Sequence, residues 1–166
     1  MSAAPDRPRV VFDCNALLQA LTSETGAAAR AVNLIGQNRI ELFLSRPVLR
    51  ELNAVLHYPE VRTHFPSLTE ERIVRFLEQL RYRSRFVRDV RHVFDYPRDS
   101  QDETYIDLAD AAKAQYLVSR DKDLLSLMTG HSLLCKQFRQ KLNPLRIVTP
   151  EVFLHEIEVD RIRSSE

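Results

Sequence analysis

Glycine is scarce in this 166-residue chain, which contains only three. Gly26, Gly36 and Gly130 lie far apart in the sequence. A loop that cradles phosphates, of either the dinucleotide or the nucleoside-triphosphate kind, needs several glycines at short spacing. The chain cannot supply one, so the nucleotide-dependent enzymes built on such loops are disfavoured.

Other signatures are also missing. The two cysteines, Cys14 and Cys135, show no zinc-type spacing, so free thiols in a reducing compartment are expected. None of the five histidines falls in an HxH or HExxH pattern, and no GxSxG occurs, so zinc and serine hydrolases have no support. No apolar run is long enough for a membrane span, and the N-terminus does not resemble a signal peptide. We expect a cytoplasmic protein.

The composition is typical of a soluble domain, with 44% hydrophobic and 28% charged residues. We therefore predict a single domain over residues 1–166, with a core at about 9–150 and a C-terminal helix at 150–162. The formal net charge is only +1, but the charges are segregated. Segment 72–91 carries seven arginines against two acids, and segment 95–110 carries six acids against one arginine. Two solvated surfaces that neutralise each other would explain this equally well.

Short apolar runs alternate with helical patterns along the chain. Strands are predicted at 10–12, 40–44, 116–119 and 145–149, with a further candidate within 86–93. Helices are predicted after Asp13 and Ser45, and at 26–38, 69–82, 103–115, 121–128 and 150–162, whereas 59–66 and 129–143 read as loops. This alternation predicts an α/β fold, a three-layer α/β/α sandwich with a mostly parallel central sheet.

Acidic residues follow two of the predicted strands. Asp13 follows the first strand and Asp121 the fourth, and open parallel sheets bind ligands at the carboxyl ends of their strands. Glu51 and Asp102, on or beside predicted helices, are further candidates, as is Asp123. Two like charges about 4 Å apart repel by roughly 4 kcal/mol at an effective dielectric near 20, so gathered carboxylates favour a cation. Oxygen ligands suit Mg²⁺ or Mn²⁺.

Each acid alone has a simpler explanation. Asp13 and Asp121 stand where a helix N-cap is expected, and an acid in a first helical turn interacts favourably with the helix dipole. Their joint placement at two strand ends is what favours a metal site.

Four segments carry a resemblance to a known family. VVFDCNALL, RPVLRELNAVL, RDSQDETYIDLA and YLVSRDKDLL, in this order and spacing over about residues 9–150, resemble a PIN domain. More narrowly, they are similar to PIN proteins described as toxin components of bacterial toxin–antitoxin pairs. The resemblance implies an α/β/α sandwich and a ribonuclease that depends on magnesium or manganese.

The resemblance also implies roles for single residues. The acidic quartet would be Asp13, Glu51, Asp102 and Asp121, with the metal held by Asp13, Asp102, Asp121 and Asp123. Asn15 and Ser119 match polar positions that steady the carboxylates. Cys14 stands where the family usually has Thr or Ser. Near the third acid, Asp99 and Glu103 compete with Asp102, which the motif favours.

The resemblance points to RNA as substrate, held by basic side chains. The candidates are Arg46, Arg50, Arg81, Arg83, Arg85 and Lys122, although a solvated helix face explains any one of them equally well. An antitoxin protein that inserts an arginine or a helix into the acidic cleft, and a homodimer through the first helices, are the implied protein partners. The main alternative is a catalytically silent PIN-like module that binds RNA or protein. A phosphatase or receiver-like domain is less favoured, because the first strand is followed by DCN and not DxD.

Overall fold

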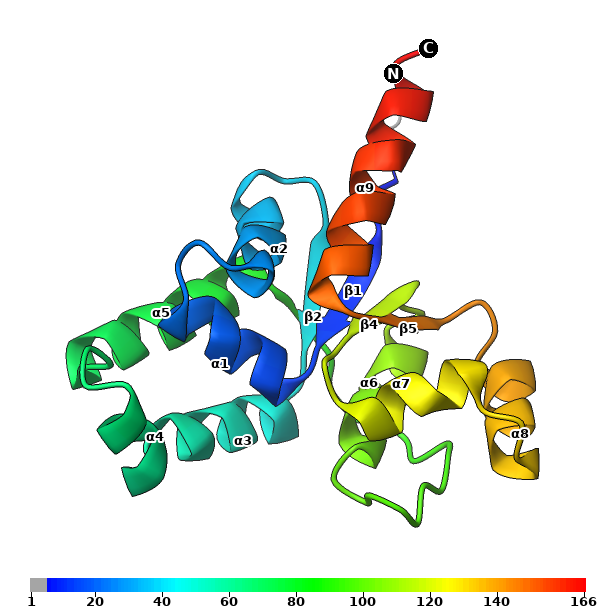
Figure 1. Cartoon of the computed structure of the whole chain (residues 1–166), viewed down its shortest axis with the longest axis horizontal. Helices are drawn as coiled ribbons and strands as arrows, with labels where there is room; N and C mark the ends of the chain where they lie inside the picture. The colour runs from blue at the N-terminus through cyan, green and yellow to red at the C-terminus, as the bar shows by residue number, and fades with distance from the viewer. Residues whose placement is uncertain (1–5) are drawn as a thin grey trace.

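The structure, a computed structural model that describes residues 6–166, is built on one five-stranded sheet (Figure 1). The strand order is β3-β2-β1-β4-β5, and every neighbouring pair runs parallel. The strands are β1 (Arg9–Phe12), β2 (Glu41–Leu44), β3 (Arg85–Phe86), β4 (Tyr116–Val118) and β5 (Arg146–Val148). The predicted fold class is confirmed, and the sheet is parallel throughout.

Helices flank this sheet. They are α1 (Cys14–Thr22), α2 (Ala27–Gly36), α3 (Arg46–Leu56), α4 (Pro59–His64), α5 (Glu70–Arg83), α6 (Glu103–Ala111), α7 (Lys122–Thr129), α8 (Leu133–Leu142) and α9 (Pro150–Ser164). Phe153 of α9 packs edge to face against Phe12 of β1 and Tyr116 of β4. Within residues 6–166, no helix has the length and apolar character needed to cross a bilayer.

β1 is the central strand, and its composition explains why. Val10, Val11 and Phe12 have no exposed surface, as expected of a parallel strand that has a neighbour on each side and helices over its faces. The strand pairs with β2 and β4 in register, with Phe12 opposite Val118. Asp13, which follows β1, and Ser119, which follows β4, therefore lie next to each other.

Two segments read as loops contain helices. α4 begins at Pro59, a residue well suited to a first helical position because its missing N–H would have no partner there. α8 begins after Ser132, whose hydroxyl accepts a hydrogen bond from the Cys135 amide at 3.2 Å. α4 is short and has no buried residue, so no apolar stripe marks it in the sequence. α8 does carry such a stripe, with Cys135, Phe138 and Leu142 buried after the Ser132 cap, and reading this segment as a loop missed that signal.

Two further elements are shorter than expected. The strand predicted within 86–93 is reduced to Arg85 and Phe86, both exposed at the edge of the sheet. A short edge strand with a charged residue limits pairing with other chains. α6 ends at Ala111, and Lys113 adopts a left-handed conformation with φ 52° that stops the helix before the predicted residue 115.

Candidate metal centre

Asp13 and Ser119 lie side by side where β1 and β4 end. The backbone amide of Asp13 donates to the Val118 carbonyl at 3.1 Å, which continues the strand pairing one residue further. Asp121 follows two residues after Ser119. The parallel pairing of these strands brings the carboxylates of Asp13 and Asp121 to one edge of the sheet, as the sequence predicts.

Asp13 is 4% exposed, and both of its oxygens accept hydrogen bonds. Oδ1 accepts from the Ala16 amide at 2.8 Å, so Asp13 is the N-cap of α1. Oδ2 accepts from the hydroxyl of Ser119. That hydroxyl in turn accepts from the Asp121 amide at 2.9 Å, so the fully buried Ser119 links the two acids.

Burial raises the pKa of Asp13 to about 6. The hydrogen bonds from Ser119 and Ala16 favour the charged form and limit the rise, whereas the charges of Asp121 and Glu51 add to it. Asp13 is therefore an acid whose ionisation is opposed by its surroundings unless positive charge is supplied.

Three carboxylates converge next to this position. Asp99, Asp102 and Asp121 each offer an oxygen, and these atoms all lie within 4.8 Å of one another. Asp102 is 6% exposed, and its Oδ2 is buried without a hydrogen-bond partner among the described residues. Although Asp102 stands at the N-cap of α6, its side chain makes no capping hydrogen bond. The helix start therefore does not account for this carboxylate.

The pKa of Asp102 is raised to about 7, first by burial and then by the charges of Asp121, Asp99, Asp13 and Asp123. A buried charge without a partner is costly, and a cation bound among the three carboxylates would remove that cost. This buried acidic group could hold a metal ion, and its donors are all carboxylate oxygens.

Asp123 is not one of these three carboxylates, although its charge contributes to the raised pKa of Asp102. Its Oδ1 pairs with Arg98 Nε at 3.2 Å, and its side chain is 39% exposed. Its backbone amide donates to Asp121 Oδ1 at 2.8 Å, which makes Asp121 the N-cap of α7. One oxygen of Asp121 is therefore used in capping.

Glu51 approaches from α3 and is held by Tyr105 of α6. The buried Tyr105 hydroxyl donates a hydrogen bond to Glu51 Oε2. Burial and this hydrogen bond raise the pKa of Tyr105, so it remains a donor at neutral pH. Cys14 lies nearby, and burial together with the charges of Glu51 and Asp13 raises the pKa of its thiol to about 12.

Other candidates are placed differently. The adjacent Glu103 belongs to a separate group with His92 and Asp95, so of the competing acids Asp102 and Asp99 are the two that meet Asp121. Asn15 is exposed in the first turn of α1. Sequence reasoning weighed Asp99 only as a rival of Asp102 and gave no role to Tyr105. The spacing of Asp99, three residues before Asp102 in one acidic loop, was the available signal.

The basic candidates fall into two sets. Arg46 and Arg50 are exposed on α3, which carries Glu51, and Lys122 follows Asp121 directly. Arg83 and Arg85 instead line a pocket with Arg7 and Glu41, which lie at the amino ends of β1 and β2, and Arg81 is exposed in the last turn of α5. Arg83 and Arg85 therefore lie near the end of the sheet where β1 and β2 begin, whereas the acids lie at the end where the strands finish.

Comparison with known proteins assigns the family. Residues 9–123, which contain β1, β4 and the acids described above, match the family model of the PIN domain. The chain belongs to the PIN domain family. This PIN domain is also 28% identical over 152 residues to an uncharacterized protein of Methanocaldococcus jannaschii, covering 90% of this chain and 92% of that protein. No solved structure shows a significant match.

Proposed function

We propose that this PIN domain is a metal-dependent endoribonuclease that uses Mg²⁺ or Mn²⁺. The observation that supports it best is Asp102 Oδ2, a buried carboxylate oxygen without a partner, set among two further carboxylates. The PIN domain family consists generally of metal-dependent nucleases, which supports this proposal. Carboxylate oxygens are the donors that these hard cations prefer.

In this proposal Asp102, Asp121 and Asp99 hold the ion. A bound divalent ion would lower the pKa of water and offset charge on the phosphate. The chain contributes the fixed positions of the donors: Asp121 through its bond to the Asp123 amide, and Asp102 through its burial at the start of α6.

Asp13 and Glu51 would orient the attacking water in this scheme. Asp13 is held in place by the Ala16 amide and the Ser119 hydroxyl, and Glu51 by the Tyr105 hydroxyl. A carboxylate held in this way can accept a hydrogen bond from water without losing freedom at the moment of reaction, which lowers the barrier. The phosphodiester would then be hydrolysed without a side-chain nucleophile.

Arg46, Arg50 and Lys122 would contact the phosphate backbone of the RNA, because they are exposed on or beside the helices that carry Glu51 and Asp121. Arg81, Arg83 and Arg85 would contact RNA only if it extends past the opposite edge of the sheet. Binding through phosphates should weaken steeply with salt.

The finer parts of the proposal come from the resemblance to toxin components. They are a cytoplasmic location, inhibition by an antitoxin that occupies the acidic pocket, and a homodimer through the first helices. Growth arrest on expression of the native chain, but not of Asp121→Asn, would support the toxin role. Growth that is equally unaffected by both chains would remove it.

The direct test is cleavage of mixed RNAs with and without Mn²⁺. The native chain should cleave only with the metal, and Asp13→Asn and Asp121→Asn should be strongly impaired. Asparagine still caps a helix, so both variants should fold. Asp110→Asn, an exposed acid at the far end of α6, is the matched control and should retain full activity.

Two results would contradict this proposal. If the native chain and both variants cleave equally, the acids are not catalytic. If the native chain binds RNA but does not cleave it either with or without divalent ions, the chain is a silent PIN-like binding module.

A further inference from the structure

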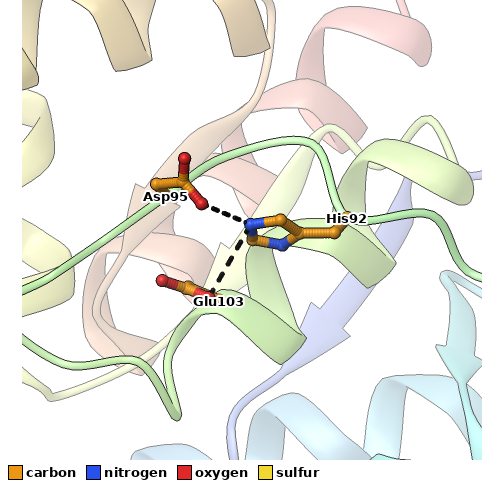
Figure 2. A group of neighbouring side chains, drawn as sticks. All are labelled: His92, Asp95 and Glu103. Carbon is orange, nitrogen blue, oxygen red and sulfur yellow. Dashed lines mark hydrogen bonds and ion pairs between the residues drawn. The ribbon is translucent and has the colours of Figure 1, made fainter.

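A second group of potential metal ligands lies outside the acidic pocket. His92 and Asp95 come from the loop before α6, and Glu103 is the first residue of that helix. In Figure 2, one nitrogen of the His92 ring faces the carboxylates of both Asp95 and Glu103. Nε2 is 2.6 Å from Asp95 Oδ1 and 3.9 Å from Glu103 Oε2.

Hydrogen bonds to other residues fix the His92 imidazole and the Glu103 carboxylate in place. The other ring nitrogen of His92, Nδ1, lies 2.8 Å from Asp107 Oδ2, and Asp107 Oδ1 accepts from the Val93 amide at 2.9 Å. Glu103 Oε1 accepts from the Tyr96 amide at 2.8 Å, which leaves Oε2 turned toward His92. At protein metal sites a histidine usually has one ring nitrogen fixed by a carboxylate while the other binds the ion, and here the nitrogen turned toward the candidate ligands Asp95 and Glu103 is Nε2.

We propose that His92, Asp95 and Glu103 form a second metal site, suited to Zn²⁺ or a similar borderline divalent ion. One imidazole nitrogen and two carboxylate oxygens, completed by water, are a ligand set that Zn²⁺ accepts. Zn–ligand bonds of about 2.0–2.1 Å place tetrahedral ligands about 3.3 Å apart. The distances of 2.6 and 3.9 Å lie on either side of that value, and Asp95, whose side chain is 87% exposed, is free to adjust.

The charge balance distinguishes this group from an ordinary histidine ion pair. Three carboxylates, those of Asp95, Glu103 and Asp107, lie within 4 Å of His92, which is their only ion-pair partner within residues 6–166. Even a protonated ring leaves the group with an excess of negative charge.

His57 provides the internal comparison. Its Nε2 lies 2.8 Å from one carboxylate, that of Glu70, and Glu70 is also paired with Arg62 at 3.4 Å. Charges are balanced there without a metal. The excess of acid around His92 calls for a doubly charged ion, and the histidine nitrogen selects a softer one than the all-oxygen pocket.

This site would connect the loop of residues 87–102 to α6. The same loop delivers Asp99 and Asp102 to the acidic pocket. Zn²⁺ bound at His92 would therefore hold that loop in place. The site does not depend on the proposed nuclease activity.

The experiment is a calorimetric titration of the full chain with Zn²⁺ in a large excess of Mg²⁺, which occupies oxygen-only sites. The native chain should bind one equivalent more than His92→Ala, and His57→Ala should match the native chain. Asp102→Asn/Asp121→Asn should keep the Zn²⁺ equivalent even if it abolishes cleavage, which separates this site from the proposed function.

Two checks keep the test decisive if His92→Ala is unstable. Asp95→Asn changes only an exposed side chain and should weaken Zn²⁺ binding by about tenfold or more. In the NMR spectrum of the imidazole nitrogens, Zn²⁺ should shift the signals of His92 before those of the other histidines. Equal Zn²⁺ binding by the native chain, His92→Ala and Asp95→Asn, or loss of the equivalent in Asp102→Asn/Asp121→Asn, would overturn the proposal.

Discussion

Asp102 and Glu103 are adjacent in the sequence, but their carboxylates lie in opposite surroundings. Asp102 is buried with a partnerless oxygen among Asp99 and Asp121, whereas Glu103 accepts a hydrogen bond from the Tyr96 amide and faces the imidazole of His92. Asp102 has a buried oxygen without a partner among the described residues, whereas Glu103 is partly exposed and both of its oxygens face a donor or an imidazole. The difference shows that the start of α6 divides the acids of one loop between two groups of side chains.

The largest expected effect comes from neutralising each of these neighbours in turn. If the proposed function holds, Asp102→Asn should lower RNA cleavage by about a hundredfold or more, about 3 kcal/mol of transition-state stabilisation, because a donor to the proposed metal ion is lost. Glu103→Gln should change it by less than about threefold. Initial rates at saturating Mn²⁺ measure both. Equal losses in the two variants would show that the two sites are not separate.

Tyr105→Phe tests whether Glu51 must be held in place. Removing the hydroxyl deletes the hydrogen bond to Glu51 Oε2 and the contact with the Cys14 thiol, and it leaves the ring in place. A hydrogen bond to a charged group contributes about 1.5–3 kcal/mol, so kcat should fall about tenfold or more while KM changes little. Tyr116→Phe, which alters a different tyrosine packed against α9, is the control. An unchanged kcat would remove Tyr105 from the proposal.

The pH dependence of the free energy of unfolding tests whether the buried carboxylate of Asp102 lacks a compensating partner. The pKa of Asp102 is about 7 in the folded protein against an ordinary value of 3.8, so the folded protein binds this proton more tightly than the unfolded chain does. Its stabilising contribution is fully present below pH 3.8 and is lost as pH rises through about 7. Without metal, the native chain should lose stability relative to Asp102→Asn between about pH 4 and 7. Guanidinium unfolding in EDTA measures this.

Added Mg²⁺ or Mn²⁺ should reverse that loss in the native chain and not in Asp102→Asn, since the ion binds only the folded state. A metal-free native chain whose stability is flat from about pH 4 to 7 would show that Asp102 is compensated by a group in the fold after all.

The smallest effect is expected at Asp123, an acid that already has a partner. Arg98→Ala removes a largely exposed ion pair and should lower the free energy of unfolding by less than about 1 kcal/mol. Urea unfolding at low and high salt would show it. A loss of about 3 kcal/mol or more in the free energy of unfolding, as for a buried ion pair, would show that Asp123 depends on Arg98 for its compensation.

Much of the fold is readable from the sequence. The β-branched and aromatic run at β1, the caps Asp13, Ser45 and Thr149, and the strand-and-helix alternation predict the parallel sheet, because each of these signals is local. Of the two helices that were predicted as loops, α8 has a local signal that was missed, the Ser132 cap and the apolar residues Cys135, Phe138 and Leu142, whereas α4 has none. The six residues of α4 are too few for a helix that its own sequence would stabilise, so the neighbouring residues alone do not predict it.

The candidate site divides in the same way. The alternation predicts that Asp13 and Asp121 lie at the same edge of a parallel sheet, and the pairing of β1 with β4, which the sequence does not predict, brings them close together. That Asp99 joins Asp102, and that Glu103 turns away, depends on the course of an irregular loop between β3 and α6. Tyr105 could not be assigned to Glu51, because the two residues lie 54 positions apart and only the packing of α3 near α6 joins them.

Because Asp13 caps α1, its presence in a related chain is weak evidence that the chain has kept its activity. Because its carboxylate also begins α1, selection for folding alone would keep an aspartate, asparagine or serine here after hydrolysis had been abandoned. Conversely, Asp102 begins α6 without capping it, so nothing in the helix would preserve it. In a lineage drifting toward a pseudoenzyme, Asp102 should disappear first, which makes it the better marker of retained chemistry.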